Sequence, residues 1–239
     1  MLNINKSFAS ENFEIRPKNT TISSIVIHFT EMDNFLEAIE RLTKPLYKVS
    51  SHYAIQKDGT IYELVSPYLK AWHAGISSWR NKNSINDFSI GIELDNNGKE
   101  EFSDKLMLSL IALCHKLIKD FPIEQPFIVG HSDVAPDRKV DPGCFFNWHL
   151  LNQNNIGIYH DIIPSKADVD LISFDLLEVQ KLLKEIGYKL EASGIMDAQT
   201  QCVIRAFNLR FYQQNINNII NAGFLARLKK CSLIMNTFL

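Results

Sequence analysis

Two histidines and an aspartate stand in this sequence where they could bind a metal ion together. His28 ends one apolar run, and His131 closely follows another. Asp141 lies further along the polar segment that begins at His131, just before Pro142-Gly143, which allows a sharp turn. Three protein ligands with an open fourth position are typical of catalytic rather than structural zinc. Zinc lowers the pKa of a bound water to about 7, which makes it a nucleophile at neutral pH.

A hydrolase of this kind also needs a general base and a group that stabilises an oxyanion. Glu93 is the leading candidate for the base, because the residues around it, Ile90, Ile92 and Leu94, are apolar. Gly91 would let another group approach this strand closely. Lys139 lies two residues before Asp141. In an extended segment the two side chains would share a face, so the ammonium could polarise a substrate carbonyl.

Each of these residues also has a plainer interpretation. A histidine at a strand end is usually a structural residue, a glutamate in an apolar strand can face solvent from a sheet edge, and a lysine is usually a surface charge. Five further histidines dilute any one assignment; they are His52, His73, His115, His149 and His160. The residue types and their spacing therefore leave a zinc hydrolase as one possibility.

Hydrophobic periodicity predicts the elements that would position these residues. Helices are expected from a cap at Asp33 to about Leu42 and from a cap at Ser103 to Ile118, closed by Pro122. An Asp-Gly turn at Asp58-Gly59 predicts a hairpin. Strands are expected at residues 23–29, 52–56, 61–65, 88–94 and 127–129. This order predicts an α/β fold with a mixed central sheet flanked by helices.

The character of the chain changes near residue 164. Residues 164–168 resemble a linker, and helical patterns follow at 176–186, from a cap at Asp197 to Phe211, and at 219–228. We therefore predict a catalytic domain over residues 1–163 and a three-helix domain over residues 164–239. The separate apolar stripes predict that this helical domain has its own core.

Composition excludes several classes of protein. The formal net charge is -2 and the sequence has no basic run, which argues against nucleic acid as a partner. The four cysteines form no C-x-x-C pair, so neither a zinc ribbon nor a dense disulfide framework is indicated. No segment is long and apolar enough to span a bilayer, and no apolar run follows Met1 as in a secretory signal.

Six segments, in order, resemble zinc-dependent N-acetylmuramoyl-L-alanine amidases of the amidase-2 family, relatives of the peptidoglycan recognition proteins and phage T7 lysozyme. They cover about residues 20 to 150. The segments are Ile25-Val26-Ile27-His28-Phe29-Thr30, Ser51-His52-Tyr53-Ala54-Ile55, Lys57-Asp58-Gly59-Thr60-Ile61-Tyr62, Ala71-Trp72-His73-Ala74-Gly75, Ser89-Ile90-Gly91-Ile92-Glu93, and Gly130-His131 through Pro142-Gly143.

The resemblance implies that His28, His131 and Asp141 bind zinc, that Glu93 is the general acid and base, and that Lys139 stabilises the oxyanion. It implies a substrate groove that includes Trp72, His73 and Ala74. Asp141 stands where some relatives have cysteine, which resembles the bacterial branch that cleaves anhydromuropeptides. The helical part resembles the peptidoglycan-binding module found beside such amidases, through Val179-Gln180-Lys181-Leu182-Leu183, Gly187-Tyr188 and Gly194-Ile195-Met196-Asp197.

The implied activity is zinc-dependent hydrolysis of the amide between N-acetylmuramic acid, including its 1,6-anhydro form, and L-alanine in peptidoglycan or muropeptides. Two alternatives stay open at this point. The chain could be a non-catalytic peptidoglycan-binding protein, although all three ligand positions and Glu93 occur together. It could also be a zinc peptidase that cuts within the stem peptide.

Overall fold

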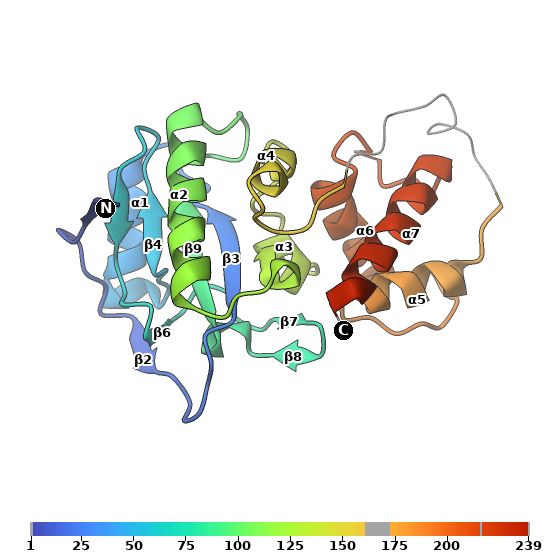
Figure 1. Ribbon diagram of the computed structural model, residues 1–239, viewed down its shortest axis with the longest axis horizontal. Helices are drawn as coiled ribbons and strands as arrows, with labels where there is room; N and C mark the ends of the chain where they lie inside the picture. Colours follow the sequence, from blue (N-terminus) through green and yellow to red (C-terminus); the bar gives the residue numbers. More distant parts are fainter. Residues whose placement is uncertain (1, 161–172, 216, 239) are drawn as a thin grey trace.

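The computed structural model describes residues 2–160, 173–215 and 217–238. A sheet lies between helices, and a group of C-terminal helices packs at one side (Figure 1). The linker predicted at residues 164–168 and the boundary after residue 163 lie outside the described residues. The strands are β1 (Ile4–Asn5), β2 (Phe13–Ile15), β3 (Ser24–Phe29), β4 (Tyr53–Ile55), β5 (Ile61–Glu63), β6 (Leu69–Ala71), β7 (Ser78–Trp79), β8 (Lys82–Asn83), β9 (Ser89–Leu94) and β10 (Ile128–Gly130). The helices are α1 (Phe35–Thr43), α2 (Asp104–Asp120), α3 (His131–Val134), α4 (Trp148–Gln153), α5 (Leu176–Ile186), α6 (Ala198–Phe211) and α7 (Ala222–Met235).

The main sheet has six strands in the order β1-β5-β4-β9-β3-β10. Strands β4 and β5 pair antiparallel, whereas β9 pairs parallel with both β4 and β3, and β3 pairs parallel with β10. The predicted mixed sheet is therefore confirmed. The predicted hairpin is confirmed as well, with Gly59 at φ 91°, a conformation that favours glycine.

The two faces of the sheet bury different helices. Ile25 and Ile27 of β3 and Ile90 and Ile92 of β9 belong to a core cluster that includes α2. Successive side chains of a strand point to opposite faces. Val26 and His28 therefore face away from α2, toward the side that carries α1 and the C-terminal helices (Figure 1).

Most predicted helix ends are confirmed by their caps. The Ser103 side chain accepts a hydrogen bond from the backbone N–H of Leu106, and Asp197 does the same for Thr200. At α1, Asn34 and not Asp33 is the capping residue. The third C-terminal helix begins and ends later than residues 219–228, since α7 spans 222–235. None of the helices in the described ranges could cross a lipid bilayer by length and apolar character.

The C-terminal helices do not have a core of their own, and that prediction is wrong. Their buried side chains, such as Leu183 and Phe207, join one cluster with Val26, Val129 and Trp79 of the preceding part. Trp79 is fully buried and meets Tyr188 edge to face, with ring centroids 5.0 Å apart. Hydrophobic stripes give the helix faces that are buried but cannot say what they pack against.

The polar segment after β10 is also more ordered than a loop. His131–Val134 form the one-turn helix α3, and all four residues are buried. The Asp133 carboxylate accepts a hydrogen bond from the Gly130 backbone N–H at 2.8 Å, which closes the start of this turn. This polar segment nevertheless contributes to the core, because Val134 belongs to the shared cluster.

Candidate metal centre and active site

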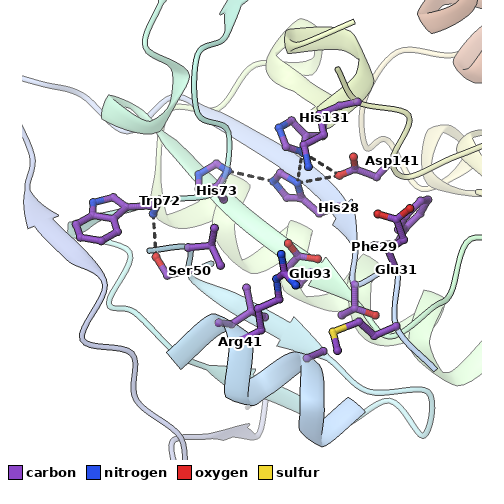
Figure 2. A pocket seen from close by; sticks show the side chains of 16 residues that line it. His28, Phe29, Glu31, Arg41, Ser50, Trp72, His73, Glu93, His131 and Asp141 are labelled. Carbon is purple, nitrogen blue, oxygen red and sulfur yellow. Dashed lines mark hydrogen bonds and ion pairs between the residues drawn. The ribbon is translucent and has the colours of Figure 1, made fainter. Parts of the chain in front are cut away.

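Three ligand atoms converge at the ends of β3 and β10. The Nδ1 atoms of His28 and His131 are 2.9 Å apart, and each lies 3.0 Å from Oδ2 of Asp141. Figure 2 shows the three side chains pointing toward one another from separate segments. The relative exposure of these residues is 1%, 3% and 6%, so the cluster is almost fully buried. These three residues are the ligands predicted from the sequence, and the structure brings them together.

Hydrogen bonds alone cannot satisfy all three ligand atoms, Nδ1 of His28, Nδ1 of His131 and Oδ2 of Asp141. The carboxylate can accept from both imidazoles, but the two Nδ1–H groups would then face each other at 2.9 Å. A cation at the centre meets all three lone pairs at once. Ligand atoms about 2.0 Å from a tetrahedral metal ion lie about 3.3 Å apart, close to the separations observed. The three residues therefore fit a divalent metal ion with nitrogen and oxygen ligands.

The fold explains how these residues meet. Val129 and Gly130 of β10 lie beside Val26 and Ile27 of β3 in parallel register, so both histidines emerge at the same sheet edge. Asp141 returns to this edge because its carbonyl oxygen accepts from the backbone N–H of Ser132 at 2.9 Å. A side chain at position 130 would lie 2.6 Å from the Pro142 ring, so glycine is needed for this close approach.

The electrostatics favour the protonation states that a metal requires. Burial lowers the pKa of His28 to about 4, and the nearby His131 adds to this effect. Burial alone would raise the pKa of the Asp141 carboxyl, but the two histidines hold it well below its usual range. Neutral imidazole and ionised carboxylate are the forms that bind metal ions.

Glu93 lies next to this cluster. It is the register partner of His28 across β3 and β9, so both side chains emerge on the same face of the sheet. Its Oε2 atom is buried and has no hydrogen-bond partner among the described residues. Burial raises the pKa of Glu93 well above its usual value, and the negative charge of Asp141 adds to the rise, whereas Lys139 lowers it. Because β9 lies between β4 and β3, the alternative that Glu93 faces solvent from a sheet edge is excluded.

One pocket joins these groups. Lys139 and Glu93 line it together with His28, His131 and Asp141. Lys139 is partly buried, unlike a typical surface lysine. Arg41, an exposed residue of α1, also lines this pocket, and the sequence analysis did not single it out. Ala38 and Leu42, from the buried side of the same helix, line the pocket as well.

The three residues expected to form a substrate groove, Trp72, His73 and Ala74, lie in different surroundings. Trp72 is partly buried and lines the pocket, and its backbone N–H donates to Ser50 Oγ at 2.8 Å (Figure 2). His73 is 8% exposed and lies behind His28, with its Nδ1 3.1 Å from Nε2 of that residue. Ala74 is fully buried, and its carbonyl oxygen lies 3.3 Å from Nε2 of His131.

Sequence reasoning missed a buried charge network behind α3. The Asp133 carboxylate accepts from Nη1 of Arg210 at 2.8 Å and from the Tyr188 hydroxyl at 2.7 Å. Arg210 also donates to the carbonyl of Ile128 in β10 at 3.1 Å. The C-terminal helices thus hold the strand and the turn that carry His131. The only signal in the sequence was an aspartate two residues after a candidate ligand.

Comparison with known proteins agrees with this architecture. The family model described as N-acetylmuramoyl-L-alanine amidase matches residues 18–144. The chain is 34% identical over 161 residues to the 1,6-anhydro-N-acetylmuramyl-L-alanine amidase AmpD of Haemophilus influenzae, covering 60% of this chain and 88% of AmpD. It is 34% identical over 212 residues to the N-acetylmuramoyl-L-alanine amidase AmiD of Escherichia coli, covering 80% of this chain and 75% of AmiD.

A solved structure extends the likeness to the C-terminal helices. The complex of Escherichia coli AmiD with anhydro-N-acetylmuramic acid-L-Ala-D-gamma-Glu-L-Lys matches with a TM-score of 0.77 at 30% identity, over 90% of each chain. The family match spans more than half of the chain and includes the converging ligands and Glu93. The chain belongs to the N-acetylmuramoyl-L-alanine amidase family.

Proposed function

We propose that this amidase hydrolyses the amide between N-acetylmuramic acid, including the 1,6-anhydro form, and L-alanine in peptidoglycan or its soluble fragments, with zinc as its cofactor. The observation that carries this proposal is the triangle of ligand atoms from His28, His131 and Asp141 beside the carboxyl of Glu93, whose Oε2 atom is buried. A metal site and a proton-transferring group lining one pocket are the parts that amide hydrolysis needs.

Zinc fits the donor set better than magnesium or calcium. Two imidazole nitrogens and one carboxylate oxygen are ligands that zinc accepts, whereas magnesium and calcium prefer oxygen alone. When bound, zinc lowers the pKa of a water molecule and polarises a carbonyl oxygen. His28, His131 and Asp141 would hold it.

Glu93 would move the proton. Burial raises its pKa well above the usual value of a carboxyl, which favours a group that can both accept and release a proton. A divalent cation in the adjacent site would offset part of that rise. We assign Glu93 the removal of a proton from the attacking water and its delivery to the alanine nitrogen as the amide bond breaks.

Lys139 would stabilise the charge that develops on the carbonyl oxygen. It lines the same pocket as the ligands and Glu93. An ammonium beside a largely buried site acts more strongly than one in water, because the local dielectric constant is lower.

The pocket also supports a bulky glycopeptide substrate. Trp72 is one of the residues that line it, and an aromatic side chain suits contact with a sugar face or the lactyl group. The relatives support the anhydro form as a substrate, since AmpD is a 1,6-anhydro-N-acetylmuramyl-L-alanine amidase and AmiD was solved with an anhydro-muropeptide.

We further propose that the functional division of the chain lies near residue 163, with amidase chemistry before it and a helical part after it. The match to AmpD supports this, because it covers 88% of AmpD but only 60% of this chain. The candidate catalytic residues all precede residue 144. The shared core implies that the helical part stabilises the amidase part, whether or not it also binds glycan.

Product analysis separates this activity from its rivals. A purified anhydro-muropeptide is incubated with the wild-type protein, and the products are identified by mass spectrometry, with Glu93→Gln as the control. Release of a free stem peptide that begins with L-alanine, together with the sugar, supports the proposal. A cut within the stem would instead indicate a peptidase, and an intact substrate would indicate a binding protein.

A further inference from the structure

The nitrogens of His28 and His131 that face away from the metal site both meet the same short segment. Nε2 of His28 lies 3.1 Å from Nδ1 of His73, and Nε2 of His131 lies 3.3 Å from the carbonyl oxygen of Ala74. We propose that His73 is a positioning residue that fixes the tautomer and the ring orientation of His28 for metal binding. This inference rests on the metal site proposed above.

The donor and acceptor roles follow from the site. If Nδ1 of His28 gives its lone pair to a metal ion, the proton of the neutral ring is on Nε2, which must donate. His73 then accepts at Nδ1 and carries its own proton on Nε2. That nitrogen lies 3.1 Å from Oγ of Ser89, a fully buried hydroxyl that can accept. Every ring nitrogen in this chain of groups has a partner of the required kind.

The ring geometry agrees with this assignment. The rings of His28 and His73 meet edge to face, with centroids 5.1 Å apart and planes at 81° (Figure 2). Metal-binding histidines usually donate their other ring N–H to a carboxylate, a carbonyl or water, and loss of that partner weakens metal binding. His131 has a carbonyl in this role, and His28 has an imidazole.

Gly91 provides the space for the His73 ring. A Cβ atom at position 91 would lie 2.4 Å from Cγ of His73, closer than real atoms approach. The backbone of Gly91 is outside the left-handed region, so its conformation does not demand glycine. The glycine is therefore needed for the approach of this ring, on the same face of β9 as Glu93.

The backbone of the segment is fixed as well. Oδ1 of Asn86 accepts from the backbone N–H of His73 at 3.2 Å and from that of Ala74 at 2.8 Å. One amide side chain thus holds both residues that face the ligand histidines. The segment is a support for the metal site, and both Trp72 and His73 line the pocket.

The test compares two substitutions at the same position, His73. His73→Leu removes the acceptor, whereas His73→Asn keeps an acceptor oxygen near the place of Nδ1. The zinc dissociation constant is measured by competition with a chromophoric chelator. We expect it to rise about 10- to 100-fold in His73→Leu and to recover largely in His73→Asn. Gly91→Ala, which displaces the ring, should weaken zinc binding by a similar factor. His115→Leu, an exposed residue of α2, is the control.

A second readout is independent of zinc affinity. The visible absorption of the cobalt(II)-substituted protein reports the coordination geometry, and it should change in His73→Leu but not in His73→Asn or His115→Leu. Thermal unfolding of the metal-free variants identifies any general loss of stability.

Two results would overturn the inference. One is a zinc affinity and a cobalt spectrum of His73→Leu that match those of the wild type. The other is an equal loss in His73→Asn and His73→Leu that follows their loss of stability. A wild-type protein that binds no zinc would refute the proposed function, and this inference with it. If the wild type binds zinc and His73→Leu binds it equally well, only the inference is refuted.

Discussion

His28 and Glu93 are register partners on the parallel strands β3 and β9, so a candidate metal ligand and a candidate proton carrier emerge side by side from the sheet. Neighbouring strands are about 4.8 Å apart, which brings both side chains within reach of one substrate bond. The relationship is set by backbone hydrogen bonds and not by a loop, so the spacing of the two groups is rigid.

Replacement of Glu93 by glutamine should separate metal binding from proton transfer. The amide has nearly the same shape but cannot accept the proton, so we expect the catalytic rate to fall about a hundredfold or more. Bound zinc, measured by elemental analysis, should stay at the wild-type level. A near-normal rate in Glu93→Gln would show that another group moves the proton.

Lys139→Ala should lower kcat more than it raises KM. A charge that meets the oxyanion only as it develops acts on the transition state, and loss of such a group costs about a hundredfold in rate. Steady-state kinetics on a soluble muropeptide measures both constants. Lys139→Arg should restore activity only in part, because the planar guanidinium is larger and differently aimed. A change in KM alone would make Lys139 a ground-state anchor.

The residues of the candidate site were easier to predict from the sequence than the residues that hold them in place. Strand patterns put His28 and His131 at strand ends, and parallel pairing then brought them together. Gly91 correctly indicated a close approach, but its partner His73 could not be identified, because that contact depends on how the segment after β6 crosses the sheet. Periodicity within one element does not contain such information.

The helical part shows the same limit on a larger scale. The caps and stripes of α5 and α6 were readable from local sequence. The link between Asp133 and Arg210 spans 77 residues, and no local signal joins two such residues. The prediction of an independent core failed for this reason.

Loss of the buried pair should destabilise the whole chain. Arg210→Met leaves the Asp133 carboxylate buried without its cation, which costs about 3–5 kcal/mol of unfolding free energy. Urea unfolding measures this change. The control is Lys229→Met, which removes an exposed pair with Glu178 at 3.6 Å and should cost about 0–1 kcal/mol. Equal effects of the two substitutions would contradict a supporting role for the C-terminal helices.

The metal-free protein should lose stability as the pH falls from about 6.5 toward 4. Burial lowers the pKa of His28 to about 4 and that of His52 to about 3, so between these values and 6.5 the unfolded chain binds protons that the folded chain does not. The stability that each of these histidines contributes is therefore complete above pH 6.5 and decreases below it, by about 1.4 kcal/mol per pH unit for each histidine. Urea unfolding at several pH values tests this, and a flat profile between pH 6.5 and 4.5 would contradict it.

The most direct test of the account is a zinc titration of the metal-stripped protein, with cleavage of an anhydro-muropeptide as the readout. We expect no activity after stripping, a linear return of activity with added zinc, and a break at about one zinc per chain, because three ligands and one open position make a single catalytic site. Asp141→Ala should bind little zinc and stay inactive. Full activity in the stripped protein, or unchanged zinc binding in Asp141→Ala, would contradict the account.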